Sequence, residues 1–309
     1  MSESPRAVVV SVPTDELASD LGELPAGVDL VVWDLRSPAP REAFDLVVPP
    51  YMSGKRLLAA LEGVRVDVLQ SQSIGYEGMG AYLPEGARLA NASGVHEAAT
   101  AEIAVGLTIS AQRDLADYVR NQEHARWAPQ FSRSVADSTV LVLGYGGVGK
   151  AVAARLAPFE TTIVPVASRA RDEDGEHIHG IDELAELLPR TDILMITLPG
   201  GEPTRGLIGA EQLALLPDGA LVVNVGRGTV LDTDALVAEL QSERLRAALD
   251  VVDPEPLPAD HPLWSAPGAL IVPHVGGAAD AMRPRIAKLV RTQIERLAAG
   301  EEPVNIVEP

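Results

Sequence analysis

The stretch STVLVLGYGGVGKAVAARLAPF, residues 138–159, contains the pattern that decides the fold. It starts as an almost continuous apolar run, typical of a buried parallel strand, and ends as an Ala-rich helical pattern. Gly144, Gly146 and Gly149 stand between the two. In a dinucleotide-binding turn the first glycine permits the tight bend, the second lets the backbone approach a pyrophosphate, and the third lets helix and strand pack closely. The stretch therefore predicts dinucleotide binding, with a structural turn that binds nothing as the alternative.

Apolar runs and helical patterns alternate on both sides of this turn. Four apolar runs before residue 96 predict parallel strands, and GKRLLAALEG (54–63) between two of them predicts a helix. A long Ala-rich helical pattern runs from 97 to about 121, with Leu107, Leu115 and Val119 on related faces. After residue 138 strands and helices again alternate with short connections. The pattern predicts an α/β protein with two Rossmann-like or flavodoxin-like domains, each a parallel sheet with helices on both faces.

One predicted strand contains a residue that disfavours it. Pro165 lies inside TTIVPVAS (161–168), the second strand of the later series. Proline has no N–H for the ladder, so we expect this strand to end or bulge there.

Composition excludes several classes of function. The chain has 309 residues, enough for two domains, and no cysteine, so disulfides and thiolate metal sites are excluded. A formal net charge of −19 repels nucleic acid and anionic membrane surfaces. There is no apolar run long enough to cross a bilayer, and the N-terminus lacks a secretory signal pattern. We expect a cytoplasmic protein with neither a nucleic-acid nor a membrane partner.

Three polar residues follow predicted strands, where ligands bind in such folds. Arg227 lies between two flexible glycines, Glu255 in a Pro-rich segment, and His274 at the end of ALIVPH. Taken singly, each has a structural alternative: an ion pair, a solvated acid, or a histidine bonded to backbone. Together, a cation, a carboxylate and an imidazole are suited to polarising a carbonyl while moving a proton.

Four segments match, in order, the signature blocks of one family. They are VLGYGGVGKAVAARLAPF, ITLPGGEPTRGLIGAEQLALLPDGALVVNVGRGTVLDTDAL, AALDVVDPEPLPADHPLW and IVPHVGG. On these blocks, and over nearly its whole length, the chain resembles the D-isomer-specific 2-hydroxyacid dehydrogenase family. The resemblance implies a nucleotide domain, residues 97–278, inserted in a substrate domain of residues 1–96 plus 279–309. It also implies a homodimer, with the long helix in the interface.

The resemblance further implies roles for single residues. His274 would protonate the substrate carbonyl oxygen, Glu255 would favour the charged imidazole, and Arg227 would hold the carboxylate. The loop SQSIGYEG (71–78) matches the family's substrate loop, which adds Ser73, Ile74 and Gly75 to Arg227 and His274 as substrate-binding residues. The cofactor-binding residues would be Gly144, Tyr145, Gly146, Gly147, Val148, Gly149, Ser168, Arg169, Arg171, Leu198, Pro199, Thr204, Val225, Asp250, His274 and Gly276.

The segment ASRAR (167–171) bears on which cofactor is used. Ser168 stands nineteen residues after Gly149, where an acid would accept a hydrogen bond from the adenosine ribose of NAD. A hydroxyl followed by guanidinium groups suits a 2′-phosphate instead, and "SR" here resembles NADP-preferring members of the family. We expect Ser168 and Arg169 to bind the phosphate with help from Arg171, so NADP(H) is preferred and NAD(H) is possible.

The expected reaction is the reversible reduction of a small 2-oxo acid, such as glyoxylate or hydroxypyruvate, to the D-2-hydroxy acid. D-3-phosphoglycerate dehydrogenase is an alternative, disfavoured because PPYMSG (49–54) lacks a basic residue for a phosphate. A dinucleotide-sensing scaffold that does no chemistry is a second alternative. The pair His177 and His179 suggests metal, but a polar loop is the favoured interpretation, so no metal is expected.

Overall fold

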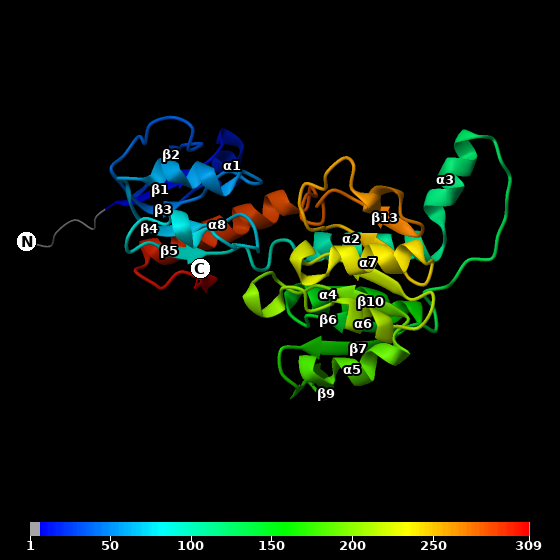
Figure 1. The fold of residues 1–309 in the computed structure, drawn as a ribbon. Coiled ribbons are helices and arrows are strands. Elements are labelled where there is room, and N and C mark those ends of the chain that lie inside the picture. Colours follow the sequence, from blue (N-terminus) through cyan, green and yellow to red (C-terminus); the bar gives the residue numbers. More distant parts are fainter. Residues whose placement is uncertain (1–6, 309) are drawn as a thin grey trace, which may run out of the picture. The chain divides into compact units, whose positions relative to one another are not determined.

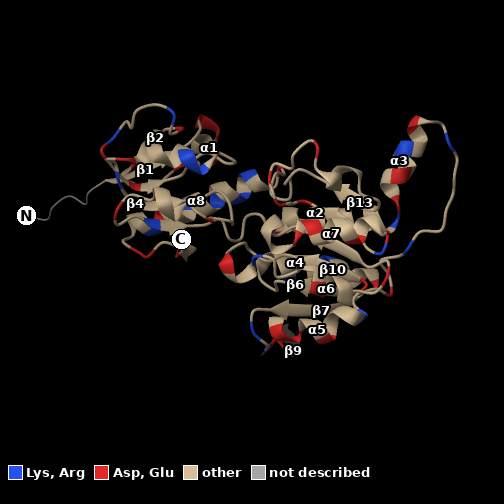
Figure 2. Ribbon diagram, in the orientation of Figure 1, with Lys and Arg blue, Asp and Glu red and all other residues tan. Residues whose placement is uncertain are grey.

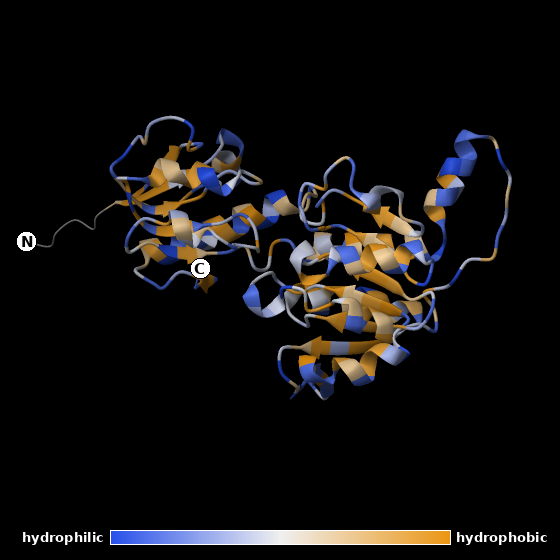
Figure 3. Cartoon of the chain, in the orientation of Figure 1, coloured by the Kyte–Doolittle hydropathy of each residue, from blue (hydrophilic) through white to orange (hydrophobic). Residues whose placement is uncertain are grey.

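The computed structural model describes residues 7–308, and the chain divides into two compact units. The first unit spans Met1–His96 and Asp280–Pro309, and the second spans Glu97–Ala279. In each unit the apolar residues concentrate in the strands and in the helix faces against them (Figure 3). Among the described residues, no helix combines the length and apolar character needed to cross a membrane.

The first unit is built on a six-stranded sheet in the order β14-β5-β4-β3-β1-β2 (Figure 1). All neighbours are parallel except β14, which is antiparallel to β5. The strands are β1 Val8–Val12, β2 Val28–Val32, β3 Ala43–Val47, β4 Arg65–Gln70, β5 Arg88–Ala90 and β14 Ile306–Val307, and the α-helices are α1 Asp15–Asp20 and α8 Met282–Ala298. The segment expected to be helical after β3 forms a 3₁₀ helix, Lys55–Leu61.

The C-terminal helix α8 belongs to the core of the first unit. Its residues Ile286, Val290 and Ile294 are buried with Val10 and Val12 of β1 in one apolar cluster. Basic residues recur along this helix (blue in Figure 2). The end of the chain thus completes the sheet that its beginning starts.

The second unit is built on an eight-stranded sheet in the order β13-β12-β11-β10-β6-β7-β9-β8. Only β8, antiparallel to β9, departs from the parallel arrangement. The strands are β6 Thr139–Leu143, β7 Thr162–Ala167, β8 Arg171–Glu173, β9 Glu176–Gly180, β10 Ile193–Ile196, β11 Leu221–Asn224, β12 Arg246–Leu249 and β13 Ala269–Ile271, and the α-helices are α2 Glu97–Gln112, α3 Leu115–Glu123, α4 Gly147–Leu156, α5 Leu184–Leu187, α6 Ala210–Leu215 and α7 Thr233–Gln241. The strand order reverses between β6 and β10, which is where dinucleotides bind in doubly wound sheets.

The long helix expected from 97 to about 121 is two helices, so that prediction was wrong. α2 ends at Gln112 and α3 begins at Leu115, because Asp114 takes a left-handed conformation with φ of +52°. α2 packs on the sheet, whereas α3 contains no buried residue and projects from the rest of the second unit (Figure 1). The apolar spacing continues across the break, but only α2 uses it for the core.

Pro165 neither ends nor bulges β7, which is also a correction. The strand pairs with β6 without interruption from Thr162 to Val166. The Thr162 N–H donates toward β6, to Ser138, so the N–H of every second residue points that way. The backbone nitrogen of residue 165 therefore points toward β9, and pairing with β9 begins only at Val166. The missing donor therefore removes no ladder hydrogen bond.

His177 and His179 lie in β9 rather than in the polar loop that the sequence favours. The charged residues Arg171, Asp172 and Glu173 form the opposite strand of a hairpin, β8. Alternation of Ile178 with polar neighbours is the strand signal, since Ile178 alone of the three is fully buried.

Candidate active site

The glycine pattern forms the connection from β6 to α4. Gly144 has a φ of +109°, which favours glycine. A methyl group on Gly149 would lie 2.2 Å from the Gly144 carbonyl oxygen, so turn and helix approach too closely for a side chain. A methyl group on Gly146 would meet nothing within 4 Å. The turn therefore has room for a phosphate beside Gly146, next to the first-turn N–H groups of α4, which a helix leaves without intrahelical acceptors.

The predicted residues of the second unit gather at one edge of its sheet. Strands β6, β7, β10, β11, β12 and β13 are parallel, so their carboxyl ends meet at the same edge. The residues that follow these ends are Gly144 after β6, Ser168 after β7, Leu198 after β10, Val225 after β11, Asp250 after β12 and His274 after β13.

Ser168 and Arg169 are exposed directly after β7. Among the described residues neither side chain has a hydrogen-bond or ion-pair partner. Arg171 differs, because its Nε and Nη2 lie 3.0 and 2.9 Å from Oε2 of Glu173. Glu173 also accepts from Lys150 of α4, and these two cations hold its pKa below the ordinary value. Of the three residues expected at the 2′-phosphate, Ser168 and Arg169 are thus the two whose side chains have no partner among the described residues.

Arg227 follows β11 on a backbone that leaves no room for side chains beside it. A methyl group on Gly226 would lie 2.4 Å from the Leu198 carbonyl oxygen. One on Gly228 would lie 1.9 Å from the Val252 carbonyl oxygen. The glycines on both sides of Arg227 therefore serve close packing, not the flexibility expected from the sequence. The guanidinium is half-buried and donates to the Gly226 carbonyl at 2.8 Å.

His274 and Glu255 form a direct pair. The Nδ1 atom of His274 lies 2.5 Å from Oε1 of Glu255, and both side chains are more than 40% exposed. The hydrogen bond to Glu255 raises the pKa of His274 above the ordinary value, against the opposing effects of burial and of Arg227. The pair therefore favours an imidazolium whose second nitrogen, Nε2, can donate a proton.

Asp250 holds the loop that carries this histidine. It is 3% exposed, and its two carboxylate oxygens accept from the Val275 and Gly276 N–H groups at 2.6 and 3.0 Å. Its carbonyl accepts from the His274 N–H at 2.8 Å, and His274 takes a left-handed φ of +52°. A methyl group on Gly276 would lie 2.7 Å from Oδ2 of Asp250. Asp250 and Gly276 together fix the backbone at His274.

Two further cofactor-binding candidates, Thr204 and Tyr145, make hydrogen bonds to neighbouring loops and strands. The Thr204 hydroxyl donates to the Pro199 carbonyl at 2.8 Å, which closes the loop after β10. The Tyr145 hydroxyl donates to Glu176 of the β8–β9 hairpin at 3.1 Å. Burial and this carboxylate raise the pKa of Tyr145.

The substrate-loop candidates Ser73, Ile74 and Gly75 follow β4 in the first unit. The Ser73 carbonyl accepts from Ala92 N–H at 3.0 Å, and that of Ile74 accepts from the Asn91 amide at 2.9 Å. Within residues 7–308, the N–H groups of Ile74 and Gly75 have no acceptor. Such a loop presents two fixed donors to an anion.

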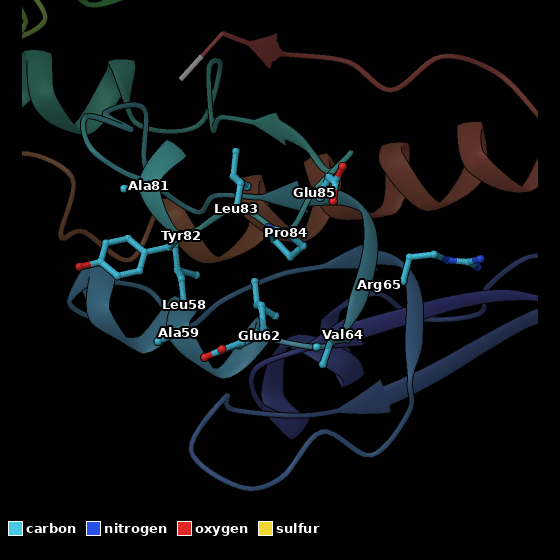
Figure 4. Close-up of a pocket in the computed structure, with 12 residues that line it drawn as sticks. Leu58, Ala59, Glu62, Val64, Arg65, Ala81, Tyr82, Leu83, Pro84 and Glu85 are labelled. Atoms are coloured by element: carbon cyan, nitrogen blue, oxygen red, sulfur yellow. The ribbon is translucent and has the colours of Figure 1, made fainter.

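A hollow of about 570 Å³ lies elsewhere in the first unit (Figure 4). Leu58, Val64, Arg65 and Tyr82 are among its lining residues. Arg65 begins β4, whereas the substrate loop follows the other end of that strand. We therefore assign the hollow no part in the site.

The family model for the NAD-binding domain of D-isomer specific 2-hydroxyacid dehydrogenases matches residues 105–276. The chain belongs to this family. It is therefore an oxidoreductase, a D-2-hydroxyacid dehydrogenase with a nicotinamide dinucleotide as cofactor. This confirms the family, the α/β fold and the class of enzyme expected from the sequence.

Relatives of this dehydrogenase match over most of its length. It is 30% identical to a glyoxylate reductase of Aeropyrum pernix over 303 residues, 90% of this chain and 89% of that one. A glyoxylate/hydroxypyruvate reductase B of Pectobacterium atrosepticum is 31% identical over 255 residues, covering 79% and 80%. The structure of a D-isomer specific 2-hydroxyacid dehydrogenase from Xanthobacter autotrophicus Py2, in complex with NADPH and MES, has a TM-score of 0.80 and 27% identity, covering 98% of each chain.

The sequence prediction missed one residue that shapes the dehydrogenase's glycine turn. The hydroxyl of Thr197, directly after β10, donates to the Gly144 carbonyl at 2.7 Å. It braces the turn from the neighbouring strand at the point where the strand order reverses. The available signal was a polar residue ending the apolar run ILMI (193–196).

Proposed function

We propose that this dehydrogenase reduces small 2-oxo acids to D-2-hydroxy acids and prefers NADPH to NADH. Glyoxylate and hydroxypyruvate are the first substrates to test, since both curated relatives described above act on glyoxylate by name. The observation that carries the proposal is the His274–Glu255 pair at the carboxyl edge of the sheet. We also propose that the unit Glu97–Ala279 binds the dinucleotide and that the other unit binds the acid.

In this proposal His274 is the general acid. Glu255 accepts from Nδ1, which stabilises the positive charge and leaves Nε2 to protonate the carbonyl oxygen. Arg227 binds the substrate carboxylate and polarises the carbonyl, a task suited to its fork of donors. A bound reduced nicotinamide would supply the hydride. The Ile74 and Gly75 N–H groups anchor the carboxylate from the substrate loop.

The cofactor would be held by the glycine turn and by the segment after β7. Residues 144–149 and the N-terminus of α4 suit the pyrophosphate, because the space beside Gly146 is open. Ser168 and Arg169 suit a 2′-phosphate, because neither side chain has another partner among the described residues and position 168 carries a hydroxyl instead of a carboxylate. Asp250, Val225 and the residues after β10 would lie around the nicotinamide. The Xanthobacter relative, in complex with NADPH, supports this preference.

We further propose a homodimer formed through α3 and the segment that follows it. Trp127 and Phe131 are 97% and 108% exposed, and Leu115 and Val119 of α3 are also exposed. Aromatic side chains that are fully exposed on a projecting segment are typical of a surface that a partner covers. A second copy of the chain fits the homodimer that the family resemblance implies.

One observation keeps D-3-phosphoglycerate dehydrogenase as a second candidate. Lys55 comes directly after PPYMSG and lines a cavity of about 50 Å³ together with Gln72 and Ser73. A basic residue therefore does lie beside the substrate loop, although the sequence prediction found none in that stretch. An ammonium group there suits a substrate with a second anionic group.

The test is a spectrophotometric panel of 2-oxo acids, including glyoxylate, hydroxypyruvate and 3-phosphohydroxypyruvate, each with NADPH and with NADH. We expect the fastest turnover with a small unphosphorylated acid and NADPH. His274→Ala should lower kcat by roughly 100- to 10,000-fold with cofactor affinity retained. Absence of turnover across the panel, with NADPH still bound, would instead indicate the dinucleotide-sensing scaffold.

A further inference from the structure

The hairpin β8–β9 places two imidazoles on one side of a strand. His177 and His179 are two positions apart in β9, so their side chains leave the strand on the same face. Their ring centroids are 4.8 Å apart, edge to face. Neither ring belongs to the hydride-transfer site, because β9 and β13 are separated by five strands, roughly 30 Å at 4.8 Å per strand.

Glu183 supplies a carboxylate to the same place. The chain turns after β9, and Oε1 of Glu183 accepts from the Gly180 N–H at 2.7 Å. Its other oxygen, Oε2, lies 2.7 Å from Nδ1 of His179. The two bonds hold the pKa of Glu183 below the ordinary value, with the Gly180 N–H as the larger cause. The two hydrogen bonds thus orient the carboxylate.

Asp172 orients the outer imidazole. It lies opposite His177 in the hairpin, and its Oδ1 is 2.8 Å from Nδ1 of that ring. A carboxylate that accepts from one ring nitrogen fixes the tautomer and leaves a lone pair on the other, as in many metal sites. Four side chains from one hairpin and its following turn therefore form a connected acid–imidazole cluster.

We propose that His177, His179 and Glu183 bind a divalent transition-metal ion of the Zn²⁺, Co²⁺ or Ni²⁺ class. One ligand atom from each residue lies within 4.8 Å of the others. Bonds of about 2.0–2.2 Å would bring tetrahedral ligand atoms to about 3.3 Å apart, a movement that partly exposed side chains can make. Two imidazoles and one carboxylate suit these ions, and water completes the coordination.

The ion would tie β9 to the turn after it. β9 pairs with β7 through His179 opposite Val166, two residues before Ser168. The metal's effect would therefore be structural, on the hairpin beside the exposed segment 168–170. No chemical step is assigned to it.

The test is a titration of the full-length, chelator-treated, tag-free enzyme with CoCl₂, followed by visible absorption, and with ZnCl₂, followed by calorimetry. We expect one equivalent bound, with the intense visible bands of tetrahedral Co²⁺. His177→Asn and His179→Asn should each abolish this binding, and Asp172→Asn should weaken it roughly 10- to 100-fold. His124→Asn, which changes an exposed histidine outside the hairpin, should bind like the unaltered enzyme.

Equal binding by the unaltered enzyme and the double variant His177→Asn/His179→Asn, or no binding by either, would overturn the proposal. Circular dichroism of each variant checks that the hairpin variants fold. The titrations contain neither cofactor nor substrate, so their outcome is independent of the proposed function.

Discussion

At the scale of single residues, the chemistry depends on which side chains already have partners. The bond to Glu255 raises the pKa of His274, whereas Arg169 has no partner among the described residues. Asp250 is buried, and its carboxylate is occupied by two backbone N–H groups. Side chains that already have partners hold the local structure or shift a neighbour's pKa, whereas a side chain without one can bind a ligand.

Replacing Glu255 by Gln should move the pH dependence of reduction. Reduction needs the imidazolium, so the rate is full below the pKa of His274 and falls as the pH rises through it. Glu255 raises that pKa, and its loss should shift the fall in kcat/KM to lower pH. The measurement is a pH–rate profile with glyoxylate, with the exposed Glu186→Gln as control. An unchanged profile would exclude Glu255 as the residue that charges His274.

Replacing Arg169 by Ala should change cofactor choice alone. One charge-assisted contact to a 2′-phosphate is worth about 1.5–3 kcal/mol, so KM for NADPH should rise roughly 10- to 100-fold. KM for NADH, which lacks that phosphate, should stay the same. Arg190→Ala, another exposed arginine of the second unit, is the matched control. Equal effects on both cofactors would show that Arg169 does not read the phosphate.

At the scale of elements, backbone approach sets which turns are possible. The β6–α4 turn, the segment around Arg227 and the loop of His274 each contain a glycine at which a methyl group would collide with neighbouring atoms. Gly146 is the exception, because the space beside it is open. The distinction separates glycines that the fold needs from one that we propose the cofactor needs.

The pair Gly149→Ala and Gly146→Ala tests this distinction. Gly149→Ala forces a methyl group against the Gly144 carbonyl oxygen and should cost about 1–3 kcal/mol of unfolding free energy. Gly146→Ala should change stability little and weaken NADPH binding. Denaturant unfolding and fluorescence titration with NADPH measure the two effects. If Gly146→Ala bound NADPH normally, the pyrophosphate would not approach that residue.

At the scale of the whole molecule, the chain forms two units, and a segment distant in sequence completes the first of them. α8 and β14 return from the C-terminus to the first unit, and α2 begins the second. α3 and the segment after it add an arm with exposed aromatic residues. This arm is therefore the surface on which the oligomeric state is to be tested.

Removing the aromatic side chains should dissociate the proposed dimer. Trp127→Ala/Phe131→Ala deletes two large exposed apolar groups, and we expect a monomer or a much weaker dimer in sedimentation velocity. The free energy of unfolding of the monomer should change little, because neither side chain is buried in it. Trp264→Ala, an exposed tryptophan outside the arm, is the control. A dimer unaffected by the double change would place the interface elsewhere.

The sequence by itself determined the α/β fold, the family and the order of the strand-end residues, because these depend on local periodicity and on motif spacing. Only the tertiary structure decided features that depend on neighbours distant in sequence. Whether Pro165 interrupts β7 depends on whether the neighbouring strand on its N–H side pairs at that position, and the helix break depends on the left-handed backbone at Asp114. The hydrogen bond from Thr197 to Gly144 and the approach of Glu183 to His179 arise from chain crossings and turns that spacing alone does not specify.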